Sequence, residues 1–198
     1  MVALRRRAPT RMTVTEFLSW DSGDPSGRGW QLIDGEPVAM APGSETHGAI
    51  QGELIGLLRD HLLEQASPCR VIAEPGVVPR VRADRNCRVP DLGVTCAKPS
   101  LDQMVSEPVL LVEVLSPSNE ADTRANIWAY TTIPSVRELL VVNSTRIEAE
   151  LLRRDSNGVW PEQPELIGPG GTLTLASIDL TIPLTALYRT TALLPPAA

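Results

Sequence analysis

The fold is decided by two stretches, RVPDLGVTC at residues 88–96 and PVLLVEVLSPSNEADTRANIWAY at residues 108–130. Each contains an apolar run with one acid: Asp91 follows Pro90 in the first, and Glu113 lies inside the second. Burying an unpaired carboxylate is strongly unfavourable, so an acid inside such a run needs a partner or a metal ion. These two acids are therefore the first candidates for functional residues.

A strand–helix–strand unit is expected from the second stretch onward. Residues 109–115 form a near-continuous apolar run, which is typical of a central strand covered on both faces. A helix over residues 120–132, capped by Asn119 or Ser118, follows, and residues 136–143 form the next apolar strand. Because a helix connects them, the two strands are predicted to be parallel neighbours.

The flanking sequence adds a hairpin and a long helix. Asp34-Gly35 is a strong two-residue turn signal within residues 30–40, which predict a β-hairpin. Residues 47–65 predict an amphipathic helix, since apolar residues recur every three or four positions. The remaining expected elements are a short helix at 13–20 with a Thr13–Glu16 capping box, strands at 70–74, 76–81 and 87–95, a hairpin of 146–154 with 159–166, short strands at 172–175 and 180–184, and a helical turn at 187–188.

Length and composition are those of one globular domain. The chain has 198 residues, 42% of them hydrophobic, and we expect a single domain at residues 12–190 between flexible tails at 1–11 and 191–198. No apolar run approaches the roughly 18 residues that cross a bilayer, so no membrane association is expected. The basic start lacks the apolar core of a secretory signal.

Charge and cysteine content limit the function classes. The net charge of −6 argues against broad electrostatic capture of nucleic acid. Four arginines in nine positions could still contact phosphate or could form a solvated hairpin tip: Arg80, Arg82, Arg85 and Arg88. Three cysteines without CxxC spacing indicate buried free thiols and a reducing cytoplasm, not a disulfide framework or a zinc knuckle.

The spacing of Asp91 and Glu113 has a chemical reason. If their strands pair antiparallel, both acids can point to one edge of the sheet. Two carboxylates held close repel each other, and a divalent cation relieves that repulsion. Oxygen ligands select hard cations such as Mg²⁺ or Mn²⁺, which can activate a water for attack on a phosphate. Glu36, after the hairpin turn, or Glu53, in the long helix, could supply a third acid.

Four sequence segments together closely resemble the Uma-two family of putative restriction endonucleases, within the PD-(D/E)-x-K nuclease superfamily. They are LIDGEPVAMAPGSETHG, CRVPDLGV, PVLLVEVLSPSNEADTRANIWAY and IPSVRELLVV, and the resemblance extends from about Met12 to Tyr188. The resemblance implies an α/β restriction-endonuclease-like core, in which a mixed β-sheet is flanked by helices and carries an additional β-hairpin.

The resemblance also implies roles for individual residues. Asp91 and Glu113 would bind Mg²⁺ or Mn²⁺, and the backbone carbonyl of Val114 would be a further ligand. Glu36 matches the early acid of the family. His47, which opens the long helix, matches a frequent polar position and would support the site together with Glu53.

One departure from the superfamily pattern concerns the lysine. The residue two positions after the second acid is Leu115, and the position in the following helix where many members carry lysine is Asn126. Asparagine can hydrogen-bond a water or a phosphate oxygen, but it cannot supply positive charge. The nearest cation in the helix is Arg124, which could stabilise a phosphate but is a poor base because it stays protonated.

Three functions remain open from the sequence. The first is a Mg²⁺-dependent endonuclease that cleaves DNA with Asp91, Glu113 and Glu36 at the metal and Asn126 or Arg124 at the phosphate. The second is a weakened nuclease-fold protein that binds nucleic acid or a protein partner. The third is a structural or regulatory homodimer whose carboxylates are merely solvated in a cleft.

Overall fold

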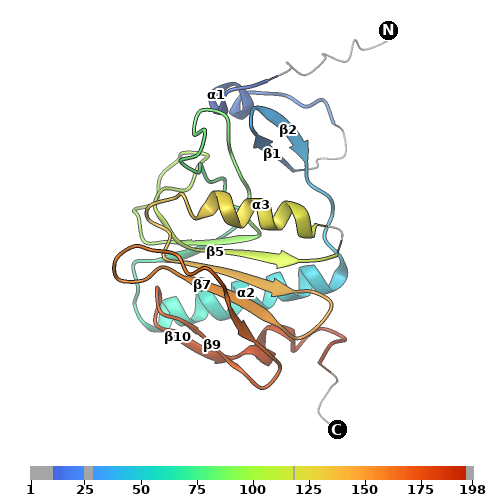
Figure 1. Cartoon of the computed structure of the whole chain (residues 1–198), viewed down its shortest axis with the longest axis vertical. Helices are drawn as coiled ribbons and strands as arrows, with labels where there is room; N and C mark the ends of the chain where they lie inside the picture. Colours follow the sequence, from blue (N-terminus) through green and yellow to red (C-terminus); the bar gives the residue numbers. More distant parts are fainter. Residues whose placement is uncertain (1–10, 25–28, 118, 195–198) are drawn as a thin grey trace.

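The computed structural model describes residues 11–24, 29–117 and 119–194 of the chain (Figure 1). In chain order its elements are α1 (Val14–Leu18), β1 (Trp30–Ile33), β2 (Glu36–Ala39), α2 (Glu45–Glu64), β3 (Arg70–Ala73), β4 (Leu92–Thr95), β5 (Pro108–Leu115), α3 (Glu120–Tyr130), β6 (Glu138–Asn143), β7 (Ala149–Arg153), β8 (Glu165–Ile167), β9 (Thr172–Leu175), β10 (Leu180–Pro183) and the 3-10 helix η1 (Leu184–Tyr188). Residues 1–10 of the first predicted tail and 195–198 of the second lie outside the described residues, as does Ser118. The prediction of a flexible tail is wrong for the start of the second one, because Thr191 is buried and Leu193 and Leu194 pack against the core.

The centre of the molecule is a six-stranded mixed sheet in the order β3-β4-β5-β6-β7-β8. β5 and β6 are parallel, with α3 as the crossover, and every other neighbouring pair is antiparallel. The predicted strand–helix–strand unit is therefore confirmed. The parallel pair forms because the helical crossover returns the chain to the same end of the sheet.

The two faces of the sheet are covered by different helices, α2 on one side and α3 on the other (Figure 1). Alternate residues of β5 divide between them: Leu110 and Val112 pack with α2, whereas Leu111 and Leu115 pack with α3. Each fully buried aliphatic side chain contributes about 2 kcal/mol. Glu113 follows the same alternation, so its carboxylate points toward α3 inside this apolar layer.

The helix starts follow the expected capping chemistry. α1 has the predicted capping box, in which Thr13 and Glu16 each accept a backbone N–H of the other. α2 begins two residues before the predicted start because the Ser44 hydroxyl accepts the His47 N–H at 3.2 Å. Asn119 precedes α3, but its side chain does not cap the helix. Instead it bonds the preceding chain, accepting the Ser116 N–H at 2.7 Å.

The additional β-hairpin predicted at residues 30–40 is confirmed as β1 and β2, a two-stranded sheet of its own. Its turn residues Asp34 and Gly35 both have positive φ, 51° and 88°, which the Asp-Gly pair accommodates. The hairpin joins the rest of the molecule through paired backbone hydrogen bonds between Leu32 and Cys87. In Figure 1 the hairpin lies at the top of the molecule, beside α1 and above α3.

Three predicted strands are shorter than expected. Residues 76–81 contribute only isolated bridges at Gly76 and Val77, and the predicted strand 87–95 is regular only in β4. The partner of β7 is reduced to β8 because Pro161 and Pro164 have no N–H to donate to a ladder. The closing strands β9 and β10 form a separate hairpin that packs on the α2 side.

The prediction of free thiols is wrong for two of the three cysteines. Cys69 and Cys96 form a disulfide, and only Cys87 is a buried free thiol. Cys69 directly precedes β3 and Cys96 directly follows β4. The antiparallel register pairs Arg70 with Thr95, so the two cysteines lie opposite each other. Strand register decided this pairing, which sequence spacing did not reveal, and the inference of a reducing compartment loses its basis.

Replacing both cysteines by serine, Cys69→Ser with Cys96→Ser, is expected to lower the free energy of unfolding by about 2 kcal/mol, because the bridge closes a loop of 27 residues. Urea denaturation of the variant and of wild type with and without reductant measures this. Cys87→Ser is the control, because it replaces a buried cysteine without breaking the bridge and so measures the effect of a Cys-to-Ser change alone. An unchanged midpoint in the double variant would mean that the bridge adds nothing to stability.

Within the described part of the chain, no helix is both long and apolar enough to cross a membrane.

Candidate active site

The antiparallel register of β4 and β5 brings Asp91 and Glu113 together. Leu92 pairs with Val112, so Asp91, one residue before β4, lies opposite Glu113. The charge of Asp91 acts on the Glu113 carboxyl group and raises its pKa, so the two carboxyl groups lie close together. The expectation that antiparallel pairing would place both acids at one site agrees with this geometry.

Glu113 is held on the α3 side of the sheet. Its Oε1 accepts the Tyr130 hydroxyl at 2.8 Å and the Asn126 Nδ2 at 3.1 Å, and only 5% of the residue is exposed. Burial, together with the charge of Asp91, raises the pKa of Glu113 to about 8, although the hydrogen bonds from Tyr130 and Asn126 oppose the rise. Tyr130 and Asn126 are four residues apart and therefore lie on one face of α3.

Asp91 is fixed from the other side by α2 and by the backbone. Its Oδ1 lies 2.9 Å from His47 Nε2, and its Oδ2 accepts the Val114 N–H at 2.6 Å. Gln51 Nε2 donates to the Asp91 carbonyl at 3.1 Å. The hydrogen bond with Asp91 raises the pKa of His47, while burial opposes the rise. His47 therefore lies in contact with one of the two acids.

These residues open onto a cleft of about 530 Å³ between α2, α3 and the hairpin. The described residues that line it include four acids and one histidine but no lysine or arginine: Gln31, Val38, Ala39, Met40, Ala41, Pro42, Gly43, Ser44, His47, Gly48, Gln51, Glu74, Val89, Asp91, Glu113, Ser116, Asn119, Asp122, Thr123 and Asn126. The N-terminal ends of α2 and α3 both face this cleft. The cleft is therefore acidic, with two helix N-termini at its rim.

Three candidates from the sequence are not brought to the cleft. Glu36 is exposed at the start of β2 and is not among the lining residues. Arg124 forms an ion pair with Glu150 of β7. Glu53 is buried on α2 and pairs with Arg189. Glu53 and His47 do lie in the first turns of the same helix, α2, as predicted. Their side chains point to different faces of it, because His47 contacts Asp91 and Glu53 pairs with Arg189.

Several side chains that build the site were not predicted from the sequence. Glu74 and Asp122 line the cleft, and Gln51 and Tyr130 bond the two acids. For Gln51 a signal existed, since it lies one helical turn after His47. Glu74 offered none, because it enters the site through a left-handed backbone conformation at the end of β3, with φ of 47°.

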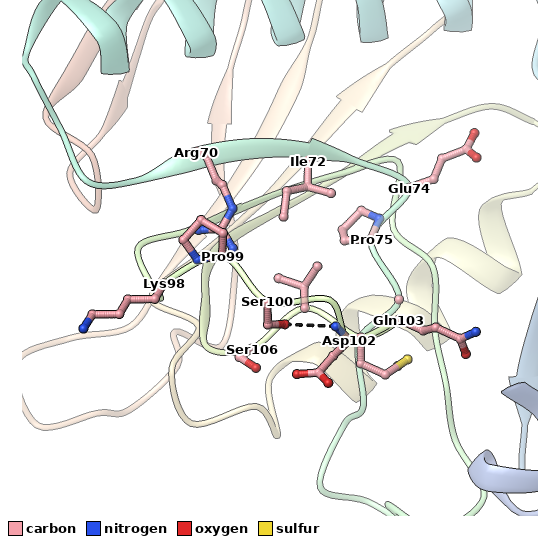
Figure 2. Close-up of a pocket in the computed structure, with 13 residues that line it drawn as sticks. Arg70, Ile72, Glu74, Pro75, Lys98, Pro99, Ser100, Asp102, Gln103 and Ser106 are labelled. Carbon is pink, nitrogen blue, oxygen red and sulfur yellow. Dashed lines mark hydrogen bonds between the residues drawn. The ribbon is translucent and has the colours of Figure 1, made fainter.

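A second cavity, of about 270 Å³, lies between β3 and the loop of residues 98–106 (Figure 2). It contains Lys98, the only lysine of the chain, whose side chain points outward, away from Glu74 in Figure 2. Asp102 donates its N–H to the Ser100 hydroxyl at 3.2 Å, which shapes the loop. No acid pair like that of Asp91 and Glu113 lines this cavity, so the larger cleft is the candidate active site.

The donor set of the cleft suits a hard divalent cation. Ionising both Asp91 and Glu113 would place two negative charges in contact, and a cation relieves that repulsion. Mg²⁺ is often held by one or two carboxylates together with waters. Among the described residues no group of three or more His, Cys, Asp and Glu side chains could hold a metal ion. The fit therefore rests on two carboxylates, with the Val114 carbonyl, which accepts Asn119 Nδ2 at 3.3 Å, close by.

Comparisons with known proteins agree on family and fold. Residues 14–185 match the Uma2 family model, described as "Putative restriction endonuclease". The chain is 30% identical over 196 residues to "Uncharacterized protein slr1290" of Synechocystis sp., a match covering 96% of this chain and 98% of the relative. A crystal structure described as a putative nuclease belonging to DUF820, from Anabaena variabilis, matches with a TM-score of 0.71 at 18% identity, over 89% of this chain and 97% of that one. The predicted restriction-endonuclease-like α/β fold is confirmed.

Proposed function

The chain belongs to the Uma2 family of putative restriction endonucleases, and we propose that it is a Mg²⁺-dependent endonuclease that hydrolyses DNA phosphodiester bonds at Asp91 and Glu113. One observation carries this proposal: the register of β4 and β5 sets Asp91 opposite Glu113, and both acids line the same cleft. Mn²⁺ is expected to substitute for Mg²⁺, since both are hard cations that prefer oxygen ligands.

The charge of the cleft supports a metal-dependent reaction. Four acids without lysine or arginine among the described lining residues would repel a DNA phosphate. A bound divalent cation would invert that local charge, activate a water and neutralise charge on the phosphate. The acidic cleft is therefore compatible with an anionic substrate when a cation is present.

The residues of the chain divide the remaining work. Asp91 and Glu113 would hold the cation, with the Val114 carbonyl as a further oxygen. His47 and the Val114 N–H orient Asp91, while Tyr130 and Asn126 orient Glu113 by occupying its Oε1. Neither of these hydrogen bonds involves Oε2 of Glu113, which would be available to a cation.

Helix ends would bind the phosphate groups. The N-terminal residues Ser44 of α2 and Asn119 of α3 both line the cleft. Unpaired N–H groups and the helix dipole at such ends favour anions. Such contacts would bind the DNA backbone on two sides of the carboxylate pair.

The proposal is tested by incubating the purified protein with supercoiled plasmid in Mg²⁺, Mn²⁺ or EDTA, alongside calorimetric titration of Mn²⁺. We expect Mn²⁺ binding, and nicked plasmid only when a divalent cation is present. Nicking that persists in EDTA would contradict a metal-dependent reaction. Mn²⁺ binding without nicking of any DNA would contradict the enzyme activity.

A second function is favoured by one feature of the cleft, the lack of a lysine among its described lining residues. A protein of the same fold that binds nucleic acid through the cleft without cleaving it would need no such group. In that case the protein would retain labelled DNA in a Mg²⁺-dependent gel shift and leave the DNA intact.

A further inference from the structure

Arg88 places a buried positive charge directly behind the acidic cleft. The residue is only 7% exposed, although arginine is rarely buried unless it is paired. Its Nη1 donates to Asn126 Oδ1 at 3.0 Å, and its Nε has no hydrogen-bond partner within the described part of the chain. Burying a guanidinium with so few partners is costly, so the position calls for an explanation beyond packing.

The neighbouring arginines behave differently. Arg82 forms an ion pair with Asp34 at 2.5 Å, and Arg85 pairs with the adjacent Asp84 at 3.4 Å. Both side chains are exposed, and Arg80 is exposed as well. The basic cluster expected from the sequence is therefore a solvated rim with one exception, Arg88.

The backbone fixes the direction of the Arg88 side chain. The Arg88 N–H donates to the Val77 carbonyl at 2.9 Å, and the Arg88 carbonyl accepts the Val77 N–H at 2.8 Å. Cys87 makes the same kind of paired contact with Leu32 of the hairpin. Because successive residues of an extended chain point to opposite sides, Cys87 enters the hairpin core and Arg88 points to α3.

This contact determines the orientation of the Asn126 amide. A guanidinium has only donors, so Asn126 must turn its Oδ1 to Arg88 and its Nδ2 to Glu113. Glu113 Oε1 then receives two donors, from Asn126 and Tyr130. Without Arg88 the amide could rotate and present its oxygen to the carboxylate, which would repel it.

Two of the acidic side chains that act on Arg88 also line the cleft. Burial lowers the pKa of Arg88, whereas Tyr130, Asp34, Asp122 and Glu113 raise it. Asp122 and Glu113 line the cleft, but Arg88 does not. The guanidinium therefore balances cleft charge from behind without occupying space that the cation or the phosphate would need.

We propose that Arg88 is a positioning residue for the carboxylate pair, acting through Asn126 to hold Glu113 with Oε2 available to a cation. The inference rests on the proposed function, because it assigns Arg88 to the same metal-binding acids. Residues that orient metal ligands in this way typically affect metal affinity by about 10–100-fold when they are removed.

The test is a double-mutant cycle in Mn²⁺ affinity, measured by calorimetry on wild type, Arg88→Met, Asn126→Ala and the variant carrying both. Each single substitution is expected to weaken Mn²⁺ binding by about tenfold. The double variant is expected to be weakened by about tenfold as well, because both changes interrupt one path. Arg85→Met removes an exposed arginine from the same segment and is expected to leave the affinity unchanged.

Two results would overturn the inference: wild-type affinity in Arg88→Met, or losses that multiply to about a hundredfold in the double variant, as independent sites would give. If Arg88→Met does not fold at the assay temperature, Arg88→Lys replaces it. Arg88→Lys is expected to weaken Mn²⁺ binding less than Arg88→Met does in the otherwise wild-type protein, and not to weaken it further in a protein that already carries Asn126→Ala. A wild type that binds Mn²⁺ but does not nick plasmid contradicts the proposed cleavage, and the cycle still decides the role of Arg88. A wild type that does not bind Mn²⁺ overturns both.

Discussion

Glu113→Gln is expected to reduce Mg²⁺-dependent DNA cleavage by at least about 1,000-fold, equivalent to roughly 4 kcal/mol of lost transition-state stabilisation. Glutamine has the shape of glutamate, and its oxygen can still accept the Tyr130 hydroxyl and the Asn126 amide. It cannot supply the negative charge that holds a cation beside Asp91. The fold should therefore remain while Mn²⁺ binding and cleavage are lost.

The matched control is Asp60→Asn, which removes an exposed acid on α2 that pairs with Arg59 far from the lining residues. Plasmid nicking and Mn²⁺ calorimetry on both variants measure the effect. Mn²⁺ affinity equal to that of wild type in Glu113→Gln would show that the carboxylate pair is not the metal site.

Glu113→Gln is also expected to stabilise the metal-free protein, although it removes metal binding and cleavage. The pKa of Glu113 is about 8 in the folded protein, against an ordinary value of 4.5 in the unfolded chain. Below pH 4.5 the group is protonated in both states and costs nothing. As pH rises from 4.5 to 8, the unfolded chain releases the proton while the folded chain retains it, so wild type loses stability. The free energy of unfolding of metal-free Glu113→Gln should exceed that of wild type by roughly 4 kcal/mol at pH 8–9, and by little near pH 4.5.

Urea denaturation across this pH range, in EDTA, measures the difference between the two proteins. Saturating Mn²⁺ should reverse the order at pH 8, because ligand binding stabilises only the protein that binds it. A constant difference at all pH values would mean that the charge of Glu113 is not the cause.

Glu138→Ala is expected to lower the free energy of unfolding by about 4 kcal/mol. Glu138 begins β6 and is 1% exposed. Its Oε1 accepts Arg153 Nε at 2.6 Å and the Ala176 N–H at 3.0 Å, and its Oε2 accepts the Ser177 N–H at 2.8 Å. Alanine would leave these donors without their partner and detach the turn between β9 and β10 from the sheet.

Arg146→Ala is the control, because Arg146 is 62% exposed and its ion pair with Glu148 lies at the surface, where such pairs contribute less than about 1 kcal/mol. Urea midpoints of the two variants provide the comparison. A Glu138→Ala midpoint close to that of Arg146→Ala would mean that the hairpin is held by apolar packing alone.

The charged residues show where sequence reasoning stopped. Asp91 and Glu113 could be identified because the first directly precedes an apolar strand and the second interrupts one, a local signal that needs no knowledge of the partner. Glu36 and Arg124 carried equally plausible chemistry, yet the former is exposed and the latter pairs with Glu150. Arg88 resembled its exposed neighbours in the sequence, and only its contact with Asn126 distinguishes it.

The sequence by itself determined what depends on residues close together in the chain: the Asp-Gly hairpin turn, the capping box of α1, the apolar strand that carries Glu113, and the parallel crossover through α3. The tertiary structure alone decided which distant side chains meet. Three contacts join segments that are distant in the sequence: the Cys69–Cys96 bridge, the contact of Asp91 with His47, and the hydrogen bond of the buried Arg88 to Asn126. Such contacts follow from strand register and from the face that each helix presents to the sheet, and both are set by packing of the whole core.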